Sequence, residues 1–195
     1  MRQSGGSVRI ALAAILLLAF PVRAAEPILL APAEPQPEAG SLRPGLAVAY
    51  AYREVKWLDE AEVWADDTKP GTPLAGFVYA NSATGDTVLT SDARELVVAF
   101  IEGYLRLEAG THELEFYSND GLRVALGGVQ VYEHDGRHTC QNDGVVLVSV
   151  PKTAWYPVKA LFFQRKLTAC LNLRVRSSGG VWRFTVPGSY AHAAN

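Results

Sequence analysis

Apolar and polar residues alternate with a period of two along most of the chain after residue 45. Leu46, Val48 and Tyr50 fall on one side of the first such segment, with alanines between them. This period is typical of a β-strand with one buried face. Similar segments or continuous apolar runs lie at 96–100, 114–116, 122–126, 129–132, 158–163 and 169–175.

Turn residues separate these segments. Gly127-Gly128 predicts a two-residue hairpin turn between 122–126 and 129–132. We also expect 158–163 and 169–175 to pair around residues 164–168. A short helix is predicted only at 59–64. Many short strands with turns between them predict an all-β domain, an antiparallel β-sandwich or barrel.

The alternation also predicts which side chains face water. Glu113 and Glu115 should be exposed, because Leu114 and Phe116 occupy the opposite face of their strand. We expect His112 to be an exposed strand residue and 134–138 to be a solvated loop. Near the end of the domain, one face should carry Leu171, Leu173 and Val175, and the other Cys170, Asn172 and Arg174.

The first 24 residues have the pattern of a cleavable secretory signal. Arginines precede an unbroken apolar run from Ile10 to Phe20, and small or aliphatic residues precede a cleavage point near Ala24. As a helix the run would span about 16 Å, about half of a bilayer core. We therefore expect a periplasmic or secreted protein with no transmembrane span after signal removal.

Residues 25–45 are rich in proline and show no periodicity. We expect a proline-rich linker, either a tether or a disordered end, followed by one domain at 46–195. The full chain has 195 residues, 49% of them apolar, and a net charge of −2. Because no stripe of basic residues is present, nucleic acid is not an expected partner.

Two cysteines, Cys140 and Cys170, predict one disulfide bond if the chain is exported. An alternative groups His134, His138 and Cys140 as zinc ligands, which would require a reduced thiol and a fourth ligand. The sequence carries none of the common motifs for nucleophilic, phosphate-binding or metal-dependent catalysis. We therefore expect a protein without enzymatic activity.

An ordered set of short motifs runs through the second half of the chain. They are Gly103-Tyr104-Leu105, Ala109-Gly110-Thr111-His112, Ser118-Asn119-Asp120-Gly121, Gly127-Gly128, Asp135-Gly136-Arg137-His138 and Trp155-Tyr156-Pro157-Val158. In this order they resemble the protective-antigen fourteen domain, found in anthrax protective antigen, flocculins, fungal adhesins and some glycosidases. The resemblance begins near residue 44 and continues to Leu173. It implies a β-sandwich and, as in the adhesins, sugar binding.

The resemblance also implies a position for the sugar site. In sugar-binding members, two consecutive acidic residues joined by a cis peptide hold calcium, and the matching pair here is Asn119-Asp120. A second sugar-contacting loop matches 164–168, where Gln164 is followed by Arg165 and Lys166. One acid is replaced by an amide and two cations lie nearby, and both changes weaken calcium binding. We expect no cofactor, with calcium on Asn119 and Asp120 left open.

These expectations place Asn119, Asp120, Gln164, Arg165 and Lys166 in one candidate ligand site. Its donors suit polar or anionic glycans. Trp155 and Trp182 could stack on sugars or pack within the domain. The expected function is an exported, non-catalytic carbohydrate-binding module acting on a glycan or cell-envelope polysaccharide. The alternative is a structural or assembly module that binds another envelope protein, for example through an edge strand.

Overall fold

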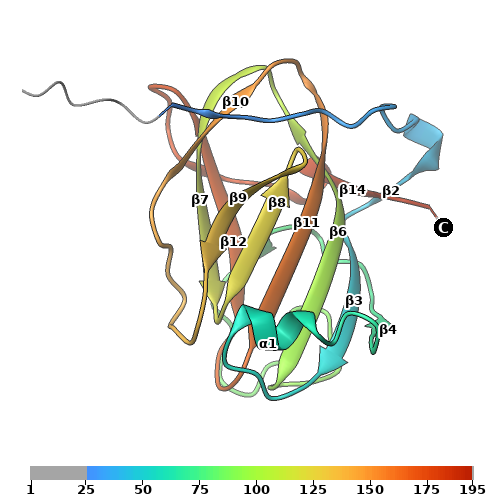
Figure 1. The fold of residues 1–195 in the computed structure, drawn as a ribbon, viewed down its shortest axis with the longest axis vertical. Coiled ribbons are helices and arrows are strands. Elements are labelled where there is room, and N and C mark those ends of the chain that lie inside the picture. Colours follow the sequence, from blue (N-terminus) through green and yellow to red (C-terminus); the bar gives the residue numbers. More distant parts are fainter. Residues whose placement is uncertain (1–25, 195) are drawn as a thin grey trace, which may run out of the picture.

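The computed structural model describes residues 26–194, which form two β-sheets packed face to face (Figure 1). Sheet A has the strand order β1-β10-β7-β12-β13, and β5 also pairs with β12. Its strands are β1 (Ile28–Leu29), β5 (Val78–Tyr79), β7 (Gly110–Asn119), β10 (Val146–Val150), β12 (Cys170–Ser177) and β13 (Arg183–Phe184).

Sheet B has the order β2-β14-β6-β11-β8-β9, and β3 and β4 extend it beside β6. Its strands are β2 (Leu42–Pro44), β3 (Ala47–Tyr52), β4 (Lys69–Pro70), β6 (Val97–Leu107), β8 (Leu122–Leu126), β9 (Val129–His134), β11 (Ala154–Gln164) and β14 (Tyr190–Ala193). The helices are α1 (Leu58–Glu62) and two short 3-10 turns, Ala39–Ser41 and Pro187–Ser189. The predicted all-β sandwich and the short helix are confirmed.

The main core lies between the two sheets and is built from alternating strand residues. Leu122, Val124 and Leu126 of β8 are each at most 1% exposed, whereas the residues between them are half-buried. Gly127 and Gly128 follow with φ values of 59° and 82°. Positive φ at both positions matches the right-handed twist of the two strands, so the predicted hairpin turn is confirmed.

The continuous apolar run at the start of β6 has its cause in α1. This helix packs against the outer face of sheet B, where a second, smaller cluster buries Val98 and Phe163 together with Leu58 and Ala61 (Figure 1). Strand β6 is therefore covered on both faces near Val98. A strand buried on both faces reads as a continuous apolar run.

The hairpin expected between 158–163 and 169–175 is wrong. Strand β11 pairs with β6 and β8 in sheet B, whereas β12 pairs with β7, β5 and β13 in sheet A. Residues 165–169 therefore cross from one sheet to the other. Both arrangements present the same alternation, so the strand pattern alone does not distinguish them.

The expected linker at 25–45 is not a free tether within its described part. Ile28–Leu29 forms a parallel strand beside β10, and Leu30 is 1% exposed. Leu42–Pro44 then pairs with β14. The segment includes the 3-10 turn Ala39–Ser41 and lies along the domain (Figure 1). The expected signal at 1–24 lies outside the described residues.

Two exposure predictions are also wrong. Glu115 is 8% exposed because its carboxylate pairs with the guanidinium of Arg174 on the neighbouring strand. His112 is 6% exposed, and its Nε2 lies 2.8 Å from the carbonyl oxygen of Glu108. The predicted faces of β12 are confirmed, with Leu171 and Leu173 buried. Within residues 26–194, no helix has the length and apolar character needed to cross a bilayer.

Candidate functional site

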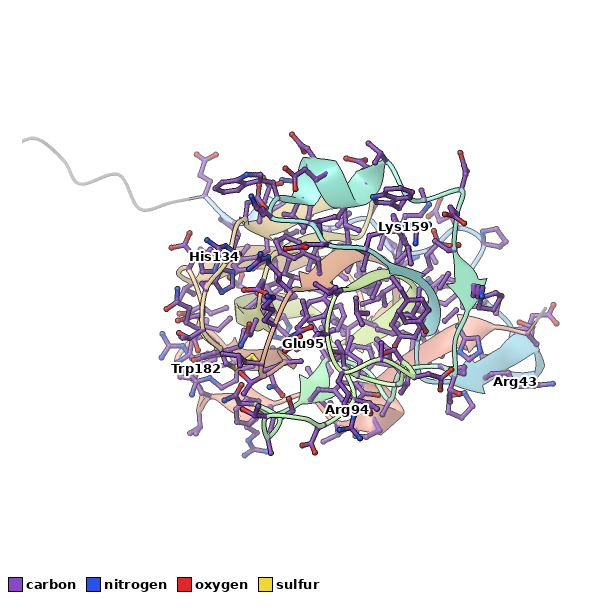
Figure 2. The ribbon with its side chains drawn as sticks, turned by 90° about the horizontal axis from the view of Figure 1, so that it is seen from below. Arg43, Arg94, Glu95, His134, Lys159 and Trp182 are labelled. Atoms are coloured by element: carbon purple, nitrogen blue, oxygen red, sulfur yellow. A yellow bond between two sulfur atoms is a disulfide. The ribbon has the colours of Figure 1, made fainter. Side chains whose placement is uncertain are left out.

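Three segments meet at one end of the sandwich, the lower end in Figure 1, and we call it the Asp120 end. It comprises residues 118–121, 134–141 and 164–168. Strand register produces this meeting, because β7 and β11 both finish here and the N–H of Asp120 donates to the carbonyl oxygen of Phe163 at 2.9 Å. The Asn119–Asp120 peptide bond is cis. Figure 2 views the molecule from this end and labels Glu95 and His134.

The carboxylate of Asp120 joins the other two segments. Its Oδ2 accepts a hydrogen bond from the main-chain N–H of Arg165 at 2.7 Å, and its Oδ1 accepts one from that of His138 at 3.1 Å. The residue is 6% exposed. Burial raises the pKa of this carboxyl, and the two N–H groups oppose the shift. Asp120 therefore acts as the clamp between the two segments.

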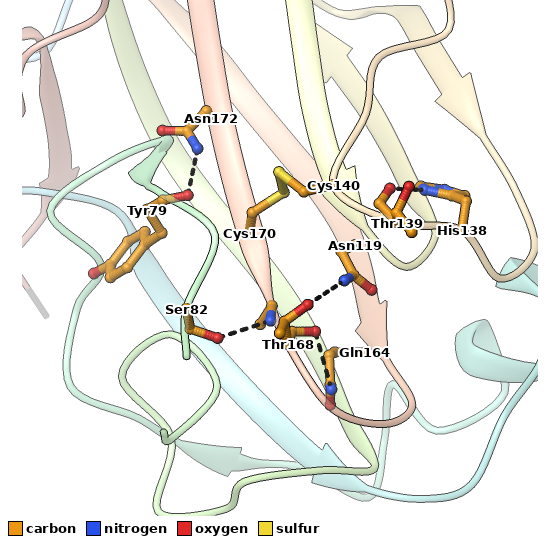
Figure 3. Close-up of a disulfide and its surroundings, with 11 residues drawn as sticks. Tyr79, Ser82, Asn119, His138, Thr139, Cys140, Gln164, Thr168, Cys170 and Asn172 are labelled. Atoms are coloured by element: carbon orange, nitrogen blue, oxygen red, sulfur yellow. Dashed lines mark hydrogen bonds between the residues drawn. A yellow bond between two sulfur atoms is a disulfide. The ribbon is translucent and has the colours of Figure 1, made fainter. Parts of the chain in front are cut away.

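Asn119 and Gln164 hold the crossing segment from inside (Figure 3). The side-chain amide of Asn119 donates to Oγ1 of Thr168 at 2.8 Å, and that of Gln164 donates to the carbonyl oxygen of Thr168 at 3.3 Å. Gln164 is fully buried, and among the described residues its Oε1 has no hydrogen-bond partner. These two amides support the loop and do not face solvent.

Arg165 and Lys166 differ in their surroundings. The guanidinium of Arg165 turns toward Glu54 and pairs with it, which lowers the pKa of the Glu54 carboxyl. Glu95 accepts a hydrogen bond from the main-chain N–H of Leu167 at 3.0 Å. Lys166 is exposed, and no hydrogen bond or ion pair joins its side chain to another described residue. Of the five expected site residues, Lys166 is the one that presents its charge to solvent.

The segment 134–138 is more ordered than the expected solvated loop. Asp135 accepts a hydrogen bond from the N–H of Leu58 at 2.8 Å, at the start of α1. The rings of His134 and His138 stack with centroids 3.6 Å apart and an angle of 3° between their planes. Burial, and then the neighbouring His138, lower the pKa of His134.

The disulfide Cys140–Cys170 is confirmed, with the Cα atoms 5.8 Å apart (Figure 3). It ties the segment 134–141 to β12. The zinc alternative on His134, His138 and Cys140 is therefore wrong, because a disulfide sulfur is not a thiolate ligand.

Trp57 is an aromatic residue at the Asp120 end that the sequence pattern does not reveal. Trp57 is 54% exposed and lies over Gly136, where an added Cβ would come within 2.9 Å of its ring. The sequence gives no indication of this contact, because Trp57 and Gly136 are far apart along the chain and meet only in the folded domain. Trp155 and Trp182 are half-buried beside arginines, with guanidinium-to-ring distances of 5.9 Å from Arg106 and 4.7 Å from Arg176.

The residues at this end do not fit a calcium site. Calcium takes about six to eight oxygen ligands, with carboxylates contributing most. Both oxygens of Asp120 accept main-chain N–H groups, and Asn119 uses its amide nitrogen on Thr168. Among residues 26–194, no three His, Cys, Asp or Glu side chains are grouped as a metal site. The cis peptide at Asn119–Asp120 is present, but the described residues around it form no cluster of oxygen ligands.

Comparisons with solved structures identify the fold. The PA14 (protective-antigen fourteen) domain of the MpAFP antifreeze protein superposes with a TM-score of 0.66 at 13% identity, over 84% of this chain and 98% of that one. A PA14 sugar-binding domain from an RTX adhesin gives 0.60 at 18% identity, over 77% and 99%. The A domain of epithelial adhesin 6 from Candida glabrata, in complex with Galb1-3GlcNAc, gives 0.65 at 14% identity, over 87% and 94%.

No family model matches the sequence, and no curated protein matches it. At these identities the structural similarity shows the fold alone. The chain has the fold of a PA14 domain, which confirms the resemblance found in the sequence.

Proposed function

We propose that this PA14-fold domain is an exported, non-catalytic module that binds acidic polysaccharide at the Asp120 end without calcium. The observation that carries the proposal is the shared capture of the Asp120 carboxylate by the N–H groups of His138 and Arg165. These two hydrogen bonds fix the main chain next to Arg137 and Lys166, so that the two cationic residues flank the Asp120 carboxylate.

The charges at this surface support an anionic ligand. Arg137 and Lys166 are exposed, and neither side chain is joined by a hydrogen bond or ion pair to another described residue. The acids nearby are already engaged: Glu54 by Arg165, Glu95 by Leu167 and Asp135 by Leu58. Only Glu54 has its charge paired, whereas Glu95 and Asp135 accept hydrogen bonds from uncharged main-chain N–H groups. The exposed cations Arg137 and Lys166 suit the carboxylate or sulfate groups of a glycan.

Trp57 supplies the apolar part of the proposed site. Sugar rings have apolar faces that pack on aromatic side chains, and a tryptophan that is 54% exposed offers a large surface for this contact. The similar adhesin domains are described as sugar-binding or carry a bound disaccharide, which supports a glycan as the ligand class. The disulfide supports an oxidising location such as the periplasm or cell exterior.

Binding of the folded protein to immobilised acidic glycans, such as alginate and hyaluronan, and to neutral glucans tests the proposal. We expect binding to the acidic glycans that persists in EGTA. Trp57→Ala and Lys166→Gln should each lower affinity about tenfold, since one good contact is worth about 1.4 kcal/mol. Trp155→Ala and Lys159→Gln are matched controls away from the Asp120 end.

Several outcomes would overturn this function. Loss of binding in EGTA would restore a calcium mechanism. Equal binding to neutral and acidic glycans would remove the role of the cations. Unchanged affinity in both Trp57→Ala and Lys166→Gln would move the ligand to another surface, and no binding to any glycan would end the proposal.

A further inference from the structure

A cavity of about 540 Å³ lies at the end of the sandwich opposite the Asp120 end. Strand register fixes its position, because His112 pairs with Ser177 while Asn119 pairs with Cys170 on the same two strands. At about 3.3 Å per residue, His112 lies about 23 Å from Asn119 along β7. The lining comes from both sheets and from the connection between β12 and β14: Leu105–Glu108, His112, Val175–Ser177, 180–181, 183–186 and Ser189.

The cavity combines an apolar wall with arginines. Val181, Phe184 and Val186 line it and are 75%, 59% and 59% exposed. Water-exposed apolar side chains grouped around a cavity are typical of a binding site. Its volume lies within the usual range of about 300 to 1,000 Å³ for small-molecule sites.

Of the three arginines that line the cavity, one forms an ion pair with a described residue and two do not. Arg176 pairs with Glu113 and lies over the ring of Trp182. Arg106 and Arg183 are both exposed, and neither forms an ion pair with a described residue. One acid, Glu108, also lines the cavity. The charge that is left is positive and favours a ligand with an acidic group.

His112 adds a polar group at the inner side. Its Nε2 faces the carbonyl oxygen of Glu108 at 2.8 Å, so this nitrogen carries the proton and donates. In the neutral ring Nδ1 is then an acceptor, and it is buried with no partner among the described residues. Such a group costs free energy unless a donor satisfies it, and because an ionised carboxylate has no donor, the acidic group of a ligand would contact the arginines and not this nitrogen.

From these features we infer that the cavity at the His112 end binds a small amphipathic carboxylate, a molecule with one acidic group on an apolar body. The acidic group meets Arg106 and Arg183, and the apolar body lies against Val181, Phe184 and Val186. This site is separate from the proposed glycan surface. The two can be tested independently, because their residues lie at opposite ends of the strands.

The experiment uses naphthoate as the probe and naphthyl methanol as its uncharged counterpart. Each is titrated into the folded protein and followed through two-dimensional amide NMR spectra. We expect saturable shifts at His112 and across 176–189 with naphthoate, and at least tenfold weaker binding of the alcohol. Arg183→Gln should weaken naphthoate about tenfold, because it removes one charge-assisted contact.

The matched control is Arg94→Gln, an exposed arginine at the other end of the molecule, labelled in Figure 2. It should leave naphthoate binding unchanged. Equal affinity for the acid and the alcohol would overturn the proposal. So would shifts confined to 118–121 and 164–168, no saturable shifts, or an Arg183→Gln variant that binds as tightly as the parent.

Discussion

The main-chain N–H of Arg165 donates to Oδ2 of Asp120 at 2.7 Å, across 45 positions of sequence. The same carboxylate accepts the N–H of His138. One side chain therefore fixes two loops that belong to different parts of the chain. The proposed glycan surface depends on this arrangement, since it sets the spacing of the residues that flank the carboxylate.

Asp120→Asn should destabilise the domain by about 1 to 3 kcal/mol, because an amide offers one acceptor oxygen where two N–H groups need partners. Urea denaturation measures the loss. Asp92→Asn, on an exposed residue of another loop, is the control and should stay within about 0.5 kcal/mol of the parent. A stability loss no larger than that of Asp92→Asn would show that the clamp is unimportant.

The raised pKa of Asp120 also predicts a pH effect. Between the unfolded value near 3.8 and the higher native value, the native state holds the proton more tightly than the unfolded chain. The contribution of Asp120 to stability therefore falls as pH rises through this window. The difference in unfolding free energy between the parent and Asp120→Asn, measured across that window, should follow this trend. A pH-independent difference would contradict it.

The stacked histidines predict the opposite sign at higher pH. The pKa of His134 is lowered from 6.5, so on acidification the unfolded chain takes up a proton before the native state does. Stability should fall as pH drops from about 7 toward the native pKa. Besides His138, the charged groups facing His134 are Asp135 and Asp143, which oppose the shift.

Chemical denaturation of His134→Gln between about pH 5 and 7.5 checks this expectation. The variant should show a shallower slope of unfolding free energy against pH than the parent. Gln141→Asn, on an exposed residue of the same segment whose side chain does not titrate, should keep the parent slope. Identical slopes in the parent and His134→Gln would exclude the stacked pair as the source.

Removal of the disulfide in a Cys140→Ser, Cys170→Ser double variant should cost about 3 to 4 kcal/mol on the chain-entropy model. The two residues are 30 positions apart, which sets the size of the closed loop. Urea denaturation of the oxidised parent and the double variant gives the difference. A loss below about 1 kcal/mol would mean that the segment 134–141 is held by its other contacts.

Two neighbouring leucines test whether the N-terminal segment belongs to the domain. Leu30 is 1% exposed and Leu29 is 65% exposed. Leu30→Ala should cost about 2 to 5 kcal/mol, because it leaves a cavity in the core, whereas Leu29→Ala should stay within about 0.5 kcal/mol. Equally small losses of unfolding free energy in both variants would show that the N-terminal segment is a tether that does not contribute to the core.

Local pattern was sufficient for the elements whose neighbours are close in sequence. The alternation at Leu122–Leu126 and the two glycines after it predicted a hairpin that the structure contains. The pattern failed where a distant partner decides the outcome. Glu115 is buried because Arg174, 59 positions away, neutralises it. Leu30 is buried because pairing of β1 with the distant β10 brings its side chain into the main core.

The candidate site likewise has parts that the sequence predicts and parts that it does not. The meeting of 118–121 with 164–168 was predicted through the resemblance to the protective-antigen fourteen domain, and the structure brings these segments together. The burial of Gln164 was not predicted, because it depends on the crossing of residues 165–169 between sheets. Trp57 was missed since α1 is joined to the segment 134–138 by a contact 77 positions long.

The ends of sheet A also bear on assembly. Its outermost strands, β1 on one side and β5 and β13 on the other, are each two residues long. A strand from a second molecule would find few free main-chain N–H and C=O groups at either edge of sheet A. Polymerisation by edge-to-edge strand pairing is therefore disfavoured. A partner that binds at the edges of sheet A must therefore do so mainly through side-chain contacts. Its specificity would then depend on the identity of those side chains and not on main-chain hydrogen bonds.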